Sequence, residues 1–192
     1  MNPKSIKLVF NQNRKFFNNS FLFVSILIFA DQISKLFFSN YLASGQNIIL
    51  IPGALSLNLI HNEILHIHQY LIYFVLGIIV LPAILVYSVG NKLSKLFIWG
   101  ILFLWGDVLS NNIIDAFFLG YIRDFIHLYG VATGNLADQY RTVGIALIAA
   151  GLVTGNSKKL SGTVIVKILL AVIAAVLLLA LFWRYLAAKY SI

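Results

Sequence analysis

Asn112-Ile-Ile-Asp115 is the first of three short stretches that decide the fold, and it is followed by Gly120-Tyr-Ile-Arg-Asp124-Phe-Ile126 and Asn135-Leu-Ala-Asp138. Each places an aspartate near the end of a long apolar segment, as does Asp31 further upstream. The chain of 192 residues has only six acidic residues. A carboxylate at the edge of a bilayer is costly unless it is paired, solvated or catalytic. These four aspartates are therefore the candidate site.

The composition is that of an integral membrane protein. Hydrophobic residues make up 60% of the chain and charged residues 10%, whereas soluble domains carry about 25% charged residues. The length suits one compact bundle. The absence of cysteine excludes disulfides, thiolate nucleophiles and cysteine metal sites. The net charge of +8 comes mostly from short loops, so it indicates orientation in a membrane and no nucleic-acid partner.

Five apolar segments are long enough to cross a bilayer, since about 20 residues span the hydrocarbon core. Basic residues gather near the N-terminus and in the loops after the second and fourth segments. The positive-inside rule makes these regions cytoplasmic, including segment 1–17, and places 39–68 and 120–136 outside. The expected spans are about 18–38, 69–89, 96–119, 137–155 and 164–186.

The first apolar segment also has features of a cleaved signal peptide. It has a basic start, an apolar run and small residues at Ala43-Ser44-Gly45. However, Asp31 and Lys35 interrupt the run, and apolar character resumes at Leu36-Phe37-Phe38. We therefore expect an uncleaved membrane anchor.

The outer region 44–62 predicts a small β element on the membrane surface. Asn47-Ile-Ile-Leu-Ile51 is rich in β-branched residues, and Pro52-Gly53 is a turn signal. Leu55-Ser-Leu-Asn-Leu59 alternates apolar and polar residues, as a half-buried strand does. The element is expected to end near His61-Asn62.

This topology brings Asp31, Asp115, Asp124 and Asp138 to one depth at the outer side of the bundle. Two aspartates that share a proton can hydrolyse a peptide without metal, serine or cysteine, because like charges about 3 Å apart do not both ionise. The ionised carboxylate takes a proton from water, and the protonated one polarises the scissile carbonyl. Asp124 and Asp138 are the best pair, because each is expected at a boundary between a loop and a helix.

Structural roles are alternatives for the same acids. Asp31 and Lys35 are four residues apart and can pair on one helical face without taking part in catalysis. Asp115 can support neighbouring helices by hydrogen bonds. Asp138 can be an acid favoured by the dipole at a helix N-terminus. Asp107 fits no motif, and it is expected to be neutral and hydrogen-bonded inside the bundle.

Four histidines raise the question of a metal site. His61, His66 and His68 do not have a recognised zinc-ligand spacing, and the nearest acid is Glu63 alone. We expect these side chains, and the lone His127, to reach solvent at the membrane interface. The sequence implies no metal and no organic cofactor.

The motifs resemble those of signal peptidase II, the lipoprotein signal peptidase of bacteria. Asp31-Gln-Ile-Ser-Lys35 is similar to its D-Q-x-S-K stretch, and Ile51-Pro-Gly53 followed by Asn62 is similar to the strand that leads to its N-x-G-A-A-F box. Asn112-Ile-Ile-Asp115, with Gly120, Asp124 and Phe125 in ungapped register, resembles N-L-I-D followed by G-x-V-V-D-F. Asn135-Leu-Ala-Asp138 resembles F-N-x-A-D. The resemblance covers roughly residues 20–155, in the family's motif order.

The resemblance implies a four-helix membrane bundle with a small periplasmic β cradle. Members of the family cut the signal peptide from prolipoproteins just before a diacylglyceryl-modified cysteine. A monomer in the bacterial inner membrane is expected, in contact with membrane lipids. Asp124 and Asp138 would be the catalytic pair. The residues expected to support that pair or bind substrate are Asp31, Lys35, Asn62, Asn112, Asp115 and Asn135.

The chain also departs from the family pattern. The arginine that follows N-L-I-D is Ala116 here, and the phenylalanine that opens F-N-x-A-D is Gly134. The box after Asn62 has lost its glycine and phenylalanine. Arg123 or Arg141 is a candidate to replace the missing positive charge. The glycines that the family has before Asn112 are replaced by residues that include Asp107, Val108 and Asn111.

These observations predict an all-α membrane bundle of four to five transmembrane helices with a small extracytoplasmic β element. The expected parts are a cytoplasmic segment 1–17, a membrane domain 18–160 and an additional C-terminal helix within 161–192. The predicted function is intramembrane aspartyl cleavage of prolipoprotein signal peptides. A non-catalytic paralogue that binds lipoprotein or lipid in the same groove is the alternative. A transporter with acids strung across the membrane is a weaker one.

Overall fold

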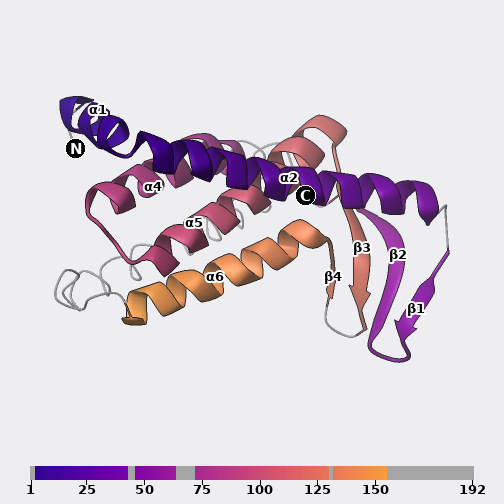
Figure 1. Ribbon diagram of the computed structural model, residues 1–192. Helices are drawn as coiled ribbons and strands as arrows, with labels where there is room; N and C mark the ends of the chain where they lie inside the picture. The colour runs from indigo at the N-terminus through magenta and orange to yellow at the C-terminus, as the bar shows by residue number, and fades with distance from the viewer. Residues whose placement is uncertain (1–2, 43–45, 64–71, 130–131, 155–192) are drawn as a thin grey trace, which may run out of the picture. The chain divides into compact units, whose positions relative to one another are not determined.

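The computed structural model describes residues 3–42, 46–63, 72–129 and 132–154. The contacts below lie within one compact unit, Met1–Gly151. Figure 1 shows a group of helices with a small sheet at one end of α2, and α1 at the other end. The helical elements are α1 (Pro3–Gln12), α2 (Arg14–Tyr41), η1 (Leu76–Val80), α4 (Leu81–Gly90), α5 (Lys95–Asp107), η2 (Val108–Phe117) and α6 (Leu136–Thr154).

Within the described residues, four helices are long and apolar enough to cross a membrane, which confirms the first four predicted spans. They are Arg14–Tyr41, Ile72–Gly90, Lys95–Phe117 and Leu136–Thr154. The first begins a few residues earlier than predicted, inside the segment expected to be cytoplasmic. The predicted fifth span at 164–186, and the C-terminal part 161–192, lie outside the described residues.

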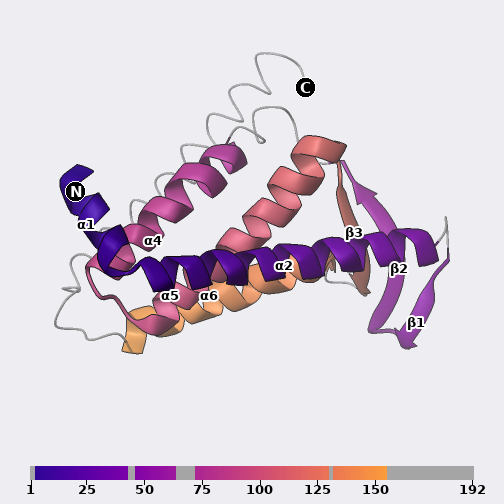
Figure 2. The same ribbon diagram turned by 45° about the horizontal axis from the view of Figure 1, so that its top comes forward.

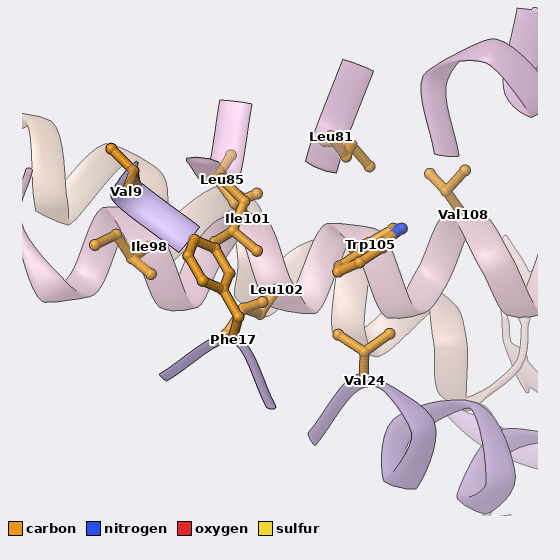
Figure 3. Packing of buried hydrophobic residues seen from close by; sticks show 10 residues of the cluster. All are labelled: Val9, Phe17, Val24, Leu81, Leu85, Ile98, Ile101, Leu102, Trp105 and Val108. Carbon is orange, nitrogen blue, oxygen red and sulfur yellow. The ribbon is translucent and has the colours of Figure 1, made fainter. Parts of the chain in front are cut away.

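The apolar interior joins α2, α4 and α5 around Trp105. Phe17 and Val24 from α2 and Leu81 from α4 are buried with it in one cluster, as Figure 3 shows. The Trp105 indole N–H donates to the carbonyl of Gly77 at 2.8 Å. A buried indole therefore has its polar atom satisfied while its ring fills the interior.

Two glycines allow α5 and α6 to approach each other backbone to backbone. A Cβ atom on Gly100 would lie 2.6 Å from Cγ1 of Ile148 and 2.7 Å from the carbonyl oxygen of Gly144. A Cβ atom on Gly144 would lie 2.9 Å from the carbonyl oxygen of Gly100. Small residues at such contacts are a common way of packing helices in membranes.

Gly144→Val is expected to destabilise the protein by about 1–3 kcal/mol, because overpacking forces the two backbones apart. Ala146→Val on the exposed face of α6 is the matched control and should change stability little. Thermal unfolding in detergent measures both variants. Equal stability of Gly144→Val and the control would contradict the close packing.

The sheet has four antiparallel strands in the order β1-β2-β3-β4. The strands are β1 (Ile48–Ile51), β2 (Leu55–Asn62), β3 (Ile122–Leu128) and β4 (Ala132–Gly134). The hairpin β1–β2 confirms the β element predicted within 44–62. Figure 2 shows β2 and β3 side by side near the end of α2.

The region 120–136, which was expected to be a loop outside the membrane, is not a simple loop, because it contains β3 and β4. Its location outside the membrane stays a prediction. The fold is therefore mostly helical with a four-stranded sheet, larger than the predicted element. Asp124 lies on β3 opposite Ile60 of β2, not at the boundary between a loop and a helix. The pairing of β3 with β2 joins segments about 60 residues apart, and short-range patterns do not reveal such a contact.

Candidate active site

The candidate site lies where α2, η2, the start of α6 and the strands β2 and β3 meet. The helix that was predicted as one span changes from α-helical to π-helical geometry at Val108 and ends at Phe117. Widened π turns often occur at functional sites. The turn carries buried Ser110, Asn111 and Asp115, and each contacts another residue of the site.

Lys35 binds three oxygen acceptors in the interior. Its Nζ lies 2.6 Å from Oδ2 of Asp31 and 3.1 Å from Oδ2 of Asp115, and it donates to Oδ1 of Asn111 at 2.6 Å. The two acids and the lysine are fully buried. An ammonium group has three protons to donate, so this one is satisfied. The predicted Asp31–Lys35 pair is confirmed.

Asp31 connects α2 to two other helical elements. The hydroxyl of Ser110 donates to its Oδ2 at 2.6 Å. The backbone N–H of Ala137 donates to its Oδ1 at 2.9 Å. Ala137 belongs to the first turn of α6, where backbone N–H groups have no partner within the helix. Asp31 thus fixes the beginning of the helix that carries Asp138.

Asp115 is held by a second cation. NH2 of Arg123 lies 2.7 Å from its Oδ1, and the backbone N–H of Arg123 donates to its Oδ2 at 3.2 Å. NH2 of Arg123 also donates to Oε1 of Gln32 at 2.6 Å, and Nε2 of Gln32 donates to Asp115 at 3.0 Å. These contacts agree with a supporting role for Asp115. They also place the positive charge of Arg123 next to Asp115, the acid directly before buried Ala116. Ala116 is the position at which the family pattern has an arginine.

Asp124 is buried and receives a hydrogen bond on each carboxylate oxygen. Nδ2 of Asn135 donates to Oδ1 at 2.8 Å, and Nδ2 of Asn62 donates to Oδ2 at 3.4 Å. Burial raises the pKa of Asp124 above its ordinary value, and the negative charge of Asp138 raises it further. Both causes favour the protonated form of Asp124.

Asp138 takes part in a capping arrangement at the N-terminus of α6. The backbone N–H of Asn135 donates to Oδ2 of Asp138 at 2.9 Å, and the backbone N–H of Asp138 donates to Oδ1 of Asn135 at 3.2 Å. This reciprocal pattern is that of a capping box. The structural role predicted for Asp138 is thus present. It does not remove the acid from the site, because Asn135 also contacts Asp124.

Gly134 provides the space that Asp138 occupies. A Cβ atom at this position would lie 2.7 Å from Oδ2 of Asp138. A side chain here would therefore displace the carboxylate from the Asn135 N–H. The glycine that replaces an expected phenylalanine is thus matched to the position of the acid.

Asp107 is buried and hydrogen-bonded, as predicted, but its principal partner is a guanidinium. Nε and NH2 of Arg141 donate to its two carboxylate oxygens at 2.8 and 2.9 Å. The buried, hydrogen-bonded position of Asp107 is therefore confirmed, whereas its neutral form stays a prediction.

The sequence matches the family model described as signal peptidase (SPase) II over residues 23–154, which is more than half of the chain. This match includes all the aspartates described above.

The chain belongs to the signal peptidase II family.

Curated relatives of this signal peptidase II chain are lipoprotein signal peptidases from streptococci. The protein of Streptococcus pyogenes serotype M5 (strain Manfredo) is 32% identical over 134 residues, which are 64% of this chain and 85% of the relative. That of serotype M3 (strain ATCC BAA-595 / MGAS315) is 31% identical over the same length and coverage.

Two solved structures are similar to this signal peptidase II chain. A bacterial membrane enzyme determined by the in meso method at 2.3 Å resolution has a TM-score of 0.60 at 27% identity, covering 72% of this chain and 89% of its own. A second one, at 1.9 Å resolution, has a TM-score of 0.59 at 26% identity, covering 72% and 95%. With four candidate spans, the family identifies a bacterial membrane protein, and it implies a protease.

Five of the six acids in this signal peptidase II chain belong to one network around Lys35, Asn111 and Asn135. Glu63 follows β2 and is exposed. Acids gathered at one place do not have the arrangement that a proton relay across the membrane requires. Within the described ranges, no three His, Asp or Glu side chains form a group that could hold a metal ion. His66 and His68 fall outside those ranges.

The network contains residues that sequence reasoning missed and lacks one that it included. Gln32, Ser110 and Asn111 had no predicted role, although Asn111 joins four members of the network. The sequence shows asparagine at position 111 where the family pattern has glycine. This difference alone did not indicate a role for Asn111. Asn112 is buried on η2, and none of the contacts described above involves it.

Proposed function

We propose that this chain is an aspartyl endopeptidase that works within the membrane and removes signal peptides from prolipoproteins. The observation that carries the proposal is the shared contact of Asn135 with two acids. Its side chain donates to Asp124, and its backbone N–H donates to Asp138. Family membership supports lipoprotein signal-peptide processing, and the pair of acids supplies a chemical means for it.

The two carboxylates differ in a way that suits general acid–base catalysis. Asp124 is 3% exposed, and burial favours its protonated form. The Asp138 side chain is 26% exposed, so water can reach it. A proton moves from the attacking water to ionised Asp138, while the Asp124 hydroxyl donates to the carbonyl oxygen of the scissile peptide. As the tetrahedral species collapses, Asp138 gives the proton taken from water to the leaving nitrogen, and a hydroxyl of the tetrahedral species returns a proton to Asp124.

The remaining acids and amides hold this pair in place. Asp31 fixes the first turn of α6, and Asn62 and Asn135 orient Asp124. Asp115, Lys35 and Arg123 connect α2, η2 and β3. The proposed substrate is a prolipoprotein with a lipid-modified cysteine, presented at the outer face of the cytoplasmic membrane.

A cleavage assay tests the function. Purified protein in detergent is incubated with a diacylglyceryl-modified prolipoprotein, and with the same protein carrying Cys→Ser at the modification site. We expect a single cut before the lipid-modified cysteine, located by mass spectrometry, and at least tenfold slower cleavage of the serine form. Binding of the lipid-modified protein without any cut would favour the non-catalytic paralogue instead.

The pH dependence of cleavage is expected to be bell-shaped, with Asp124 responsible for the alkaline limb. Catalysis requires the proton on Asp124, so the rate falls as the pH rises through its raised pKa. The Asn62 hydrogen bond favours the ionised form of Asp124. Asn62→Leu should therefore move the alkaline limb of kcat/KM to higher pH. A limb that stays in place, or that moves to lower pH, would contradict this assignment.

A further inference from the structure

Arg141 lies on α6, one turn after Asp138, between two acids. Its Nε and NH2 donate to Asp107 at 2.8 and 2.9 Å, and its NH1 lies 3.1 Å from Oδ1 of Asp138. One guanidinium thus uses two of its nitrogens on a buried acid and the third on a member of the proposed catalytic pair. The planar group makes such contacts in a fixed geometry.

Asp107 is the anchor of this arrangement. It ends α5 and is buried, whereas the side chain of Arg141 is 45% exposed. Nδ2 of Asn111, one turn further on, donates to Oδ1 of Asp107 at 3.0 Å and to Oδ1 of Asp138 at 3.3 Å. Asp107 therefore restrains both groups that contact Oδ1 of Asp138, one as a bidentate acceptor and one through a hydrogen bond.

Charged side chains approach Asp138 from three elements, whereas η2 contacts it through the neutral amide of Asn111. Asp107 approaches from α5, Asp124 from β3 and Arg141 from α6 itself. Lys35 on α2 contacts two other acids and reaches Asp138 only through Asn111. Within the part of the chain that the structure describes, Arg141 is thus the cation in direct contact with Asp138. Without Arg141, Asp138 would face Asp107 and Asp124 with no cation in direct contact with it.

We propose that Arg141, fixed by Asp107, is a positioning residue that holds Asp138 as the ionised carboxylate, so that Asp138 activates the water and Asp124 keeps the proton. This inference rests on the proposed function. It gives a common purpose to Asp107, Asn111 and Arg141. Asp107 and Asn111 both fall in the stretch where this chain departs from the glycine pattern of its family.

The test compares two substitutions of one side chain. Arg141→Gln removes the cation. Arg141→Lys keeps the charge but cannot make the two-nitrogen contact with Asp107. Arg14→Gln, at an exposed position that begins α2, is the matched control for loss of an arginine. Two quantities are measured: the pH profile of kcat/KM, and the infrared titration of the Asp138 carboxylate, assigned by difference from Asp138→Asn.

We expect Arg141→Gln to move the acidic limb, and the Asp138 infrared titration, to higher pH by about half a unit to one unit, which is less than the roughly one to three units of a close buried cation because Arg141 is half-exposed. Arg141→Lys should move both by a smaller amount in the same direction, and it remains informative if Arg141→Gln fails to fold. The control should stay close to the wild type.

A shift to lower pH in either Arg141 variant would overturn the proposal, as would unchanged profiles with a lower kcat, since neither outcome is compatible with Arg141 holding Asp138 ionised. The infrared titration needs no substrate. If the wild-type protein cuts no prolipoprotein, the proposed function fails, and the direction of the infrared shifts alone still decides whether Arg141 holds Asp138 ionised.

Discussion

Asp138→Asn is expected to lower kcat/KM for prolipoprotein cleavage by about two to four orders of magnitude, the contribution of a positioned general base. The amide is nearly the same size as the carboxylate, and its oxygen can still accept the N–H of Asn135 that now bonds to Asp138 at 2.9 Å. The cap of α6 is therefore retained while the proton acceptor is lost. Insertion and folding should be unaffected.

Asp124→Asn should have a loss of similar size, because an amide cannot deliver the proton that the mechanism requires. Glu63→Gln is the matched control, since it changes the one acid outside the network from acid to amide at an exposed position. Rates are compared by a gel-shift assay with lipid-modified substrate under single-turnover conditions. Activity within tenfold of the wild type in either aspartate variant would remove that residue from the catalytic pair.

Lys35→Met is expected to destabilise the protein by about 3–5 kcal/mol, because it leaves a buried charge without its partner. Lys35 and Asp31 are both fully buried and lie 2.6 Å apart. The remaining contacts of Asp31 are to the Ser110 hydroxyl and the Ala137 N–H, which do not carry a full positive charge. The start of α6 should therefore loosen together with α2.

A second substitution shows whether charge or packing causes this loss. Asp31→Asn combined with Lys35→Met removes both charges, so the double variant should be more stable than Lys35→Met alone. Lys95→Met, at the exposed start of α5, is the matched control and should stay close to the wild type. Thermal unfolding in detergent gives the comparison. A Lys35→Met protein within about 1 kcal/mol of the wild type would contradict a structural need for the pair.

Features that depend on neighbouring residues in the sequence could be predicted. Runs of apolar residues gave four spans, and the spacing of Asp31 and Lys35 gave their ion pair. The turn at Pro52-Gly53 and the alternation after it gave the first hairpin. Each of these rests on the period of a single helix or strand, which a single sequence displays.

Features that depend on pairing between distant segments could not be predicted. The strand that carries Asp124 has two adjacent polar residues, Arg123 and Asp124, and therefore lacks the alternation that indicates a strand in a sequence. Its pairing with β2 shows that it is a strand. Arg141 and Asp107 are 34 residues apart, so no short motif links them. The bidentate contact of Arg141 with Asp107 requires that α5 and α6 lie close together, and this close packing depends on Gly100 and Gly144.

The order in which the parts of the site are synthesised has a consequence for the growing polypeptide. Chains emerge N-terminal end first, so Lys35 and its partner Asp31 are made well before the strand that carries Asp124. Asp138 and Arg141 come later still, in the last described helix. Until the ribosome has added Asp138 and Arg141, the growing polypeptide therefore lacks part of the proposed catalytic site. Under the proposed mechanism, the growing chain can cleave a substrate only after α6 has been made and has joined the site.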